Sequence, residues 1–210
     1  MNRWQFFVTH RADILQATAT HLSLVAISML IAIAVAIPLG MFIVQRPALR
    51  SIALGVASIF QTIPSLALFG FLIPIPFIGG IGTRTAIVAL VLYAILPILR
   101  NTYVGLTGID PAILQAAEAM GMTSNQILWR VRLPLALSVI LAGIRTATVI
   151  TIGVATIAAA IGAGGLGTFI FRGVAMVSDA VILAGAIPAA LLAIIADALL
   201  ALLERHLKVT

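Results

Sequence analysis

Ionisable and nucleophilic side chains are scarce in this 210-residue sequence, and their spacing limits the chemistry that it could perform. The three histidines, His10, His21 and His206, make no metal-ligand spacing, so polar residues at a membrane interface explain them better than a metal site does. There is no cysteine, which excludes disulfides and thiolate chemistry. Serine and threonine are plentiful, yet no Ser/His/Asp set can be proposed. We therefore expect no catalytic residue, no metal and no cofactor bound by this chain, which argues against a membrane enzyme.

Two patterns associated with nucleotides lack the context that they need. Residues 162–167, GAGGLG, satisfy G-x-G-x-x-G, but no strand precedes them and no acidic residue stands about twenty positions on. A flexible turn on the outer face is the better interpretation, within a Gly-rich loop over Gly162–Ala180. The only lysine is Lys208, so the chain has no P-loop lysine to hold ATP phosphates. Any energy from ATP must therefore come from a partner.

The composition indicates an all-α, polytopic membrane protein. Hydrophobic residues make up 62% of the chain and charged residues 9%, whereas soluble domains have about 25% charged residues. The net charge of +6 does not indicate nucleic-acid binding, because the basic residues are scattered along membrane flanks and form no basic face.

Five apolar segments have about the length that a bilayer requires, and they make one transmembrane domain over residues 1–210. Residues 1–20 are too polar to span, and their aromatic residues suit the membrane interface. Pro64 interrupts the second segment, so we expect a kink or break there. The expected spans are Leu22–Val44, Leu49–Ile73, Thr85–Tyr103, Leu135–Ile161 and Val181–Leu203.

The distribution of basic residues predicts the orientation, because cytoplasmic loops carry the excess of lysine and arginine. With five spans the N-terminus lies outside and the C-terminus in the cytoplasm of a bacterial inner membrane. The cytoplasmic side then collects Arg46, Arg50, Arg100, Arg130, Arg132, Arg205 and Lys208, against Arg3, Arg11, Arg84 and Arg172 outside.

A polar island, Asp110–Pro134, separates the third and fourth spans and is hereafter called the docking segment. Asp110 is a suitable N-cap, so a short helix should begin there and run through Ala119. Gly121 then allows the chain to stop or bend. The segment predicts an exposed helix that ends at a glycine elbow.

A second short helix should follow the elbow. Thr123 and Gln126 have the spacing of a capping box, which predicts a helix start. We expect this helix to cover Ser124–Arg132 and to end at Pro134, because proline disrupts the interior of a helix.

The docking segment resembles the EAA loop, E-A-A-x3-G-x9-I-x-L-P, of permease subunits in binding-protein-dependent ABC importers with MetI-like architecture. Gln115 stands where that family has Glu, and Val131 where it has Ile; Glu118, one turn on, could replace the missing charge. The resemblance implies that this cytoplasmic loop docks on an ATPase subunit through Gln115, Ala116, Ala117, Glu118, Gly121, Leu133 and Pro134.

Residues 60–67, 92–103 and 142–148 are similar to permeases for osmoprotectants such as glycine betaine, choline and carnitine. This resemblance implies a homodimer or a pair of related permease chains, two ATPase subunits that bind ATP and Mg, and a separate substrate-binding protein. A permease for methionine or another small amphipathic solute is the alternative within the class. An ATPase-independent channel or ion-coupled transporter is the alternative outside it.

A few polar residues inside the expected spans are candidates for function. Arg145 and Asp197 lie deep enough to be costly unless paired or hydrated, and a pair between them is geometrically possible. It could support the structure, or act in the pathway or in transmitting motion. A polar path is a hypothesis for Gln61, Thr62, Pro64, Ser65, Thr148 and Thr151, with Thr146 and Thr156; bonding to their own helices is the alternative.

Overall fold

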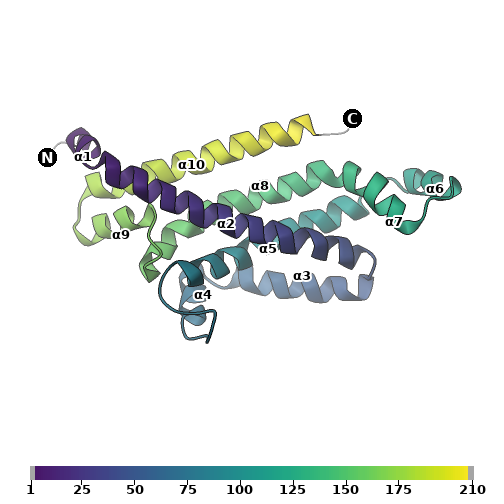
Figure 1. Ribbon diagram of the computed structural model, residues 1–210, viewed down its shortest axis with the longest axis horizontal. Helices are drawn as coiled ribbons and strands as arrows, with labels where there is room; N and C mark the ends of the chain where they lie inside the picture. The colour runs from purple at the N-terminus through teal and green to yellow at the C-terminus, as the bar shows by residue number, and fades with distance from the viewer. Residues whose placement is uncertain (1–2, 208–210) are drawn as a thin grey trace.

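The protein is a bundle of helices with a docking segment at one end. A computed structural model describes residues 3–207, and within that range all regular structure is helical (Figure 1). Lys208, which the sequence assigns to the cytoplasmic side, lies outside the described residues. The α-helices are α1 (Arg3–Thr9), α2 (Arg11–Val44), α3 (Pro47–Thr62), α4 (Ser65–Leu72), α5 (Thr83–Thr107), α6 (Pro111–Ala119), α7 (Ser124–Ile127), α8 (Leu133–Ile157), α9 (Gly167–Ala175) and α10 (Asp179–His206). A π-helical turn, η1 (Leu128–Arg132), and a 3₁₀ turn, η2 (Ala158–Ile161), flank α8.

The described residues hold four continuous helices long and apolar enough to cross a membrane, or five spans when the bent α3–α4 pair is counted as one. The continuous ones are α2, α5, α10 and the stretch Ser124–Ile161 that includes α8. This agrees with the predicted spans to within a few residues, with two exceptions. Helix α2 begins at Arg11 and not near Leu22, and the fourth continuous helix begins at Ser124 and not near Leu135. The polar first turns of α2 are helical because they continue the apolar span and pack on α10 through Ile14 and Ala17.

The predicted break in the second span is confirmed at Pro64. Helices α3 and α4 meet there at 103°. Proline lacks a backbone N–H, so the helical hydrogen-bond ladder cannot run through it, and carbonyls at the end of α3 need other partners. The Tyr93 hydroxyl of α5 donates a hydrogen bond to the Ile63 carbonyl. A side chain from the neighbouring helix thus stabilises irregular backbone at membrane depth, as such a break requires.

Helix α5 is the centre of the bundle, and small residues let its neighbours approach it closely. It packs against α2, α8 and α3, and half of the residues in its most apolar stretch are buried. A Cβ on Gly143 of α8 would lie 2.6 Å from Asn101 Cβ, and one on Gly40 of α2 would lie 2.5 Å from Thr102 Cγ2. Glycine at helix contacts is typical of membrane bundles, where close backbone packing replaces the hydrophobic effect.

The prediction of a loop over the whole of Gly162–Ala180 is wrong for Gly167–Ala175. The segment contains α9, which packs tightly against α10 and η2 (Figure 1). Phe169 of α9 is buried, and Phe6 and Phe7 pack against the same cluster, so these two rings contact protein. The GAGGLG stretch itself is a turn, with positive φ at Gly162, Gly164 and Gly165.

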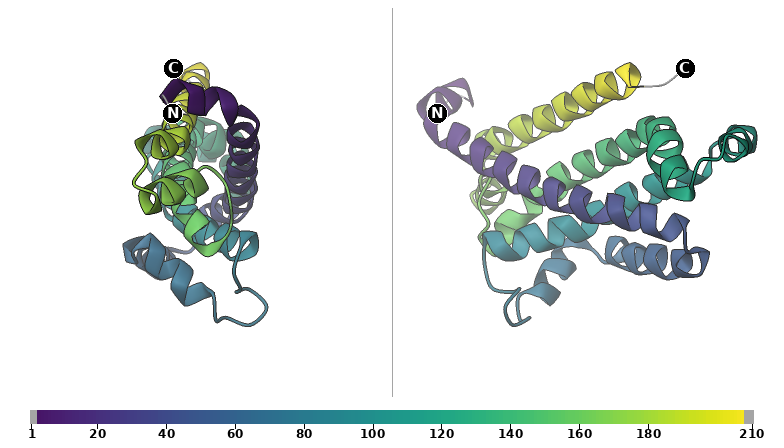
Figure 2. Two further views of the ribbon diagram at one scale, coloured as in Figure 1. Left: turned by 90° about the vertical axis from the view of Figure 1, so that its left-hand side faces the viewer. Right: turned by 45° about the vertical axis from the view of Figure 1, so that its right-hand side comes forward.

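The connections gather at two ends of the bundle. The α2–α3 turn, the docking segment and the end of α10 lie at one end, whereas α1, α9 and the turn after α4 lie at the other (Figure 1). Helices α3 and α4 flank one side of the bundle and α10 the opposite side (Figure 2).

Candidate functional site

The first helix of the docking segment forms as predicted, and its two ends are fixed by local hydrogen bonds. The Asp110 carboxylate accepts a bond from the Ala112 N–H at 2.8 Å, as an N-cap does. At the other end Gly121 has φ +78°, and its N–H bonds to the Glu118 carbonyl at 2.9 Å. The next N–H, of Met122, reaches the Ala117 carbonyl at 3.2 Å, which completes a Schellman motif. The elbow therefore depends on a residue that tolerates left-handed backbone, which is glycine's property.

The second helix begins as predicted but does not end at Pro134. Thr123 and Gln126 form the capping box, with the Gln126 N–H donating to Thr123 Oγ1 at 3.3 Å and the Thr123 N–H donating to Gln126 Oε1 at 2.8 Å. After Ile127 the helix continues through the π turn η1 into α8. A π turn is wider than an α turn, and this irregularity directly before Pro134 accommodates the proline where a regular helix would break. The docking segment is thus continuous with the fourth span.

The docking segment exposes one face and anchors the other. Gln115, Ala116 and Glu118 are exposed, whereas Ala117 is buried. Gly121 and Pro134 are exposed and Leu133 is half-buried. The Arg132 guanidinium donates to the Leu106 carbonyl of α5 at 3.3 Å. Movement of α7 and η1 would therefore be passed to α8, by continuity, and to α5, by this bond.

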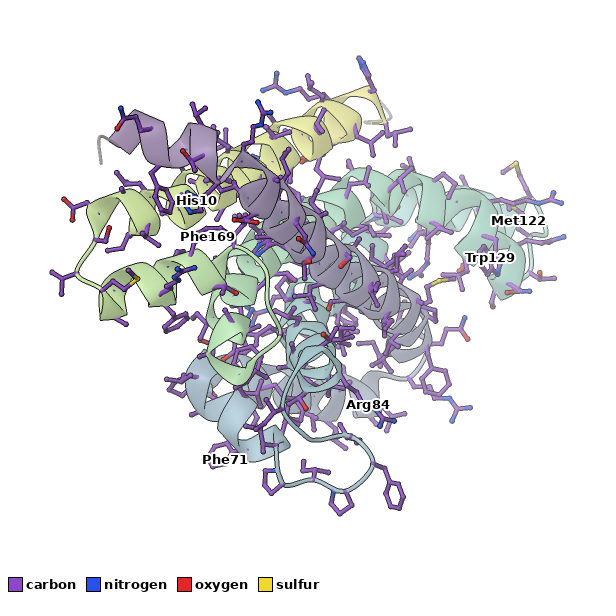
Figure 3. The ribbon with its side chains drawn as sticks, turned by 60° about the vertical axis from the view of Figure 1, so that its left-hand side comes forward. His10, Phe71, Arg84, Met122, Trp129 and Phe169 are labelled. Carbon is purple, nitrogen blue, oxygen red and sulfur yellow. The ribbon has the colours of Figure 1, made fainter. Side chains whose placement is uncertain are left out.

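Large apolar side chains surround the elbow, and none of them is among the contact residues predicted from the sequence. Met120 and Trp129 are exposed, and Met122 and Trp129 project at the opposite end of the molecule from His10 and Phe169 (Figure 3). A hollow of about 150 Å³ lies beside them, lined by Val44, Gln45, Glu118, Ser124, Ile127, Leu128 and Arg132. The sequence signal that could have predicted this apolar surface is the presence of Met120 and Met122 on either side of Gly121 in an otherwise polar segment. Such a patch outside the spans is typical of a protein-binding surface.

The candidate pathway threonines hydrogen-bond to backbone carbonyls of their own helices. Thr146, Thr148, Thr151 and Thr156 all donate to carbonyls of their own helix, at 2.7 to 2.9 Å. Thr151 is also buried against Met29 of α2, and Thr62 donates to the Ile59 carbonyl. Gln61 and Ser65 lie half-buried at the α3–α4 break beside Pro64. For these hydroxyls the alternative, bonding within the helix, is what the structure shows.

The Arg145–Asp197 pair is confirmed. Arg145 Nε lies 2.6 Å from Asp197 Oδ1, and Nη2 lies 3.0 Å from Oδ2, which is a bidentate contact between α8 and α10. Arg145 Nη1 is also 3.5 Å from Glu204 Oε2. Glu204 was missed because it lies beyond the apolar run, although it stands seven residues after Asp197 and so on the same helix face.

The interpretation of all three histidines as interfacial residues is wrong for His21. This side chain is fully buried, with Nε2 at 3.2 Å from the Ile152 carbonyl of α8. It packs against Gly165, which ties the GAGGLG turn to α2. No three His, Asp or Glu side chains within residues 3–207 are placed to share a metal ion.

These features match a known family. Residues 28–209 match the model of the family described as binding-protein-dependent transport system inner membrane component. The chain belongs to this family. It is therefore a permease of the inner membrane and not itself an enzyme, and it works with ATPase and substrate-binding partners, which removes the stand-alone channel and the membrane enzyme as alternatives.

Relatives with assigned substrates cover nearly the whole permease. It is 46% identical over 204 residues to the carnitine transport permease protein OpuCD of Listeria monocytogenes, covering 97% of this chain and 90% of the relative. It is 47% identical over 196 residues to the glycine betaine/carnitine/choline transport system permease protein OpuCD of Bacillus subtilis strain 168, covering 93% and 84%. Among solved structures, an inward-facing form of the MetNI methionine ABC transporter has a chain that matches with a TM-score of 0.83 at 24% identity, covering 92% of this chain and 95% of that one. That likeness shows that the fold is MetI-like.

Proposed function

We propose that this permease forms part of the path by which an ABC importer carries a quaternary-amine osmoprotectant, such as glycine betaine, choline or carnitine, across the inner membrane. The observation that carries this proposal is identity of 46% and 47%, over almost the full chain, with permeases named for these solutes. The likeness to the methionine transporter is one of fold and gives methionine no comparable support. A second permease chain, identical or related, would complete the path.

The docking segment is the proposed contact with the ATPase. Two ATPase subunits would bind ATP and Mg and hydrolyse the ATP, and α6 would dock on one of them through Gln115, Ala116, Glu118 and Gly121. The buried Ala117 would hold the opposite face of α6 against the permease. Its exposed small residues allow close approach, and the continuity of α7, η1 and α8 offers a route for motion into the bundle. Leu133 and Pro134 lie at the junction where that motion would enter α8.

The orientation is part of the same proposal, with the docking segment and C-terminus in the cytoplasm and the N-terminus outside. The excess of basic residues at the docking end supports it. Reporter fusions after Gln45 and Gly121 should then give a cytoplasmic signal, and fusions at Gly80 and Gly165 an external one. A cytoplasmic signal at Gly165 would contradict the orientation.

Uptake by the complete transporter tests the substrate. Cells that lack other importers and express this permease with its ATPase and binding protein should accumulate labelled glycine betaine, choline or carnitine in an ATP-dependent way. Methionine serves as the competing substrate in the same cells. Uptake of methionine alone would reject the osmoprotectant assignment and favour the alternative.

Substitution of the elbow glycine tests the coupling contact. Gly121→Asp places a charged side chain on exposed left-handed backbone with no atom within 4 Å of the new Cβ, so the spans should stay intact. We expect the variant to insert in the membrane, to lose ATPase co-purification and to abolish uptake. Gly80→Asp is the matched control, because Gly80 is also exposed, has positive φ and has no atom within 4 Å of an added Cβ, but lies in the turn after α4. Normal uptake with Gly121→Asp would remove the docking assignment.

A further inference from the structure

The contact between α8 and α10 contains more negative than positive charge. Arg145 is held by Asp197 through two nitrogens, at 2.6 and 3.0 Å, and only its third nitrogen faces Glu204, at the longer distance of 3.5 Å. Asp197 therefore already satisfies most of the guanidinium. One arginine and two carboxylates leave the cluster with one negative charge in excess, and Glu204 is the group that supplies it.

The cluster is open to its surroundings although it lies in apolar helices. The side chains of Arg145 and Asp197 are 36% and 41% exposed, and that of Glu204 is 30% exposed. They line a groove of about 350 Å³ whose other residues are Ala142, Thr146, Val149 and Ile150. Arg205, the next residue after Glu204, is about 100° away around the helix and is not among the residues that line the groove.

Lipid is an unfavourable neighbour for such a groove. Ionisable side chains inside spans almost always face other protein or a water-filled cavity, because hydrocarbon cannot solvate them. The other helices bury little of α10, since only 6% of the residues in its most apolar stretch are buried. The apolar residues of α10 can face lipid, but exposing the charged groups of Arg145, Asp197 and Glu204 to hydrocarbon would cost free energy.

We propose that this groove faces the aqueous translocation path, and that Glu204 gives it a negative potential that favours cationic solutes. The inference rests on the proposed function, and it assigns to this site the attraction of the onium group that glycine betaine, choline and carnitine share. Arg145 and Asp197 position the two helices, and Glu204 sets the charge. A negative groove raises the local concentration of a cation relative to an anion of the same size.

Thiol labelling tests the exposure of the groove, because the native chain has no cysteine and an introduced one is its only thiol. The sites are Thr146→Cys, in the groove, and Leu199→Cys as control. Leu199 is 62% exposed and lies two residues after Asp197, so it has similar depth on the opposite face of α10. Each variant is assembled with its ATPase in lipid nanodiscs and treated with water-soluble methanethiosulfonates. We expect Thr146→Cys to react and Leu199→Cys to react at least about tenfold more slowly, because a thiol in hydrocarbon stays protonated and unreactive. Equal, slow reaction at both sites would overturn the proposal.

The role of Glu204 is tested by comparing a cationic and an anionic reagent of similar size on Thr146→Cys. We expect the cationic reagent to react faster, and Glu204→Gln to lower the ratio of the two rates by about tenfold, as removal of one nearby charge should. Glu204→Asp keeps the charge and should keep most of the ratio. A ratio unchanged by Glu204→Gln would show that this carboxylate does not set the potential of the path. Labelling needs no transported substrate, so these results are separate from a failure of the osmoprotectant assignment, which uptake measures.

Discussion

Glycines occur both in the docking segment and in the segment Gly162–Ala180, but they meet a different physical requirement in each. In the docking segment, Gly121 adopts φ +78°, and a Cβ added there would have no atom within 4 Å, so glycine is needed for backbone conformation alone. In the segment that contains α9, Gly167 and Gly173 are helical, and a Cβ there would lie 1.8 Å from the Thr156 carbonyl oxygen and 2.5 Å from the Ile182 nitrogen. The first glycine serves the chain's own turn, and the other two serve contact with distant elements. Substitutions at the two ends should therefore fail in different ways.

The largest expected effect is that of Gly167→Ala. The added methyl group would overlap the α8 backbone, which cannot move aside as a flexible side chain could. Overpacking of this kind costs about 3 kcal/mol or more, so we expect a much lower yield of monodisperse protein and a lower melting temperature in detergent. Gly153→Ala is the control, since Gly153 is also helical and a Cβ added there would have no atom within 4 Å. A melting temperature equal to that of the native protein would show that α9 is not held by this close approach.

This contrast also explains which parts of the fold could be predicted from the sequence. The docking segment was predicted correctly from Asp110 through Gln126, because N-caps, the capping box and the glycine elbow act between residues close in the chain. Helix α9 was missed because its stability comes from packing of Phe169 against α10, which no local pattern records. The continuation of the helix past Pro134 was missed for a related reason, since proline predicts a stop unless a π turn precedes it.

For the charged residues of the spans too, the sequence did not predict contacts between residues far apart in the chain unless each residue stood out within its own span. The Arg145–Asp197 pair could be proposed because each residue is the single charge in an apolar run, and pairing is the usual solution there. Glu204 sits in the polar end of α10, where a carboxylate needs no explanation, so only the structure reveals its place beside Arg145. The contact of His21 with the Ile152 carbonyl likewise joins residues far apart in the chain, and its place at the edge of a span does not predict it.

The second prediction concerns backbone conformation at the elbow. Gly121→Ala places a Cβ on left-handed backbone, which costs roughly 1–2 kcal/mol, without any clash. We expect faster hydrogen exchange at Glu118–Met122 and weaker ATPase co-purification, with an unchanged melting temperature of the spans. Gly121→Asn should retain more function, because asparagine tolerates this conformation better than alanine. Equal behaviour of the two variants would show that φ is not what the position requires.

The third prediction removes the cap of the second docking helix. Thr123→Ala loses the Oγ1 acceptor of the Gln126 N–H, and loss of an N-cap costs about 1 kcal/mol. The rest of this helix is held by its continuation into α8, so the loss of stability should be confined to the exposed first turn. It should appear as faster hydrogen exchange at the backbone amides of Ser124–Gln126. Thr123→Ser keeps the hydroxyl and serves as the control. Faster exchange extending into α8 would contradict the view that the docking segment depends on local interactions.

The smallest effect on stability should come from Gln115→Glu, which restores the residue typical of the EAA loop. Gln115 is exposed in α6, and the two residues have nearly equal helix propensity. The new carboxylate would repel Glu118, three residues on, by about 0.2–0.5 kcal/mol, and this repulsion is confined to the exposed helix α6. The melting temperature should therefore not change. Binding of the ATPase should be equal or slightly stronger, unless its groove is adapted to the neutral amide, and Gln115→Lys is the control of opposite charge. If Gln115→Glu weakened ATPase binding while Gln115→Lys preserved it, the partner's groove would be acidic at this point, and Gln115 would be the permease's match to that particular ATPase.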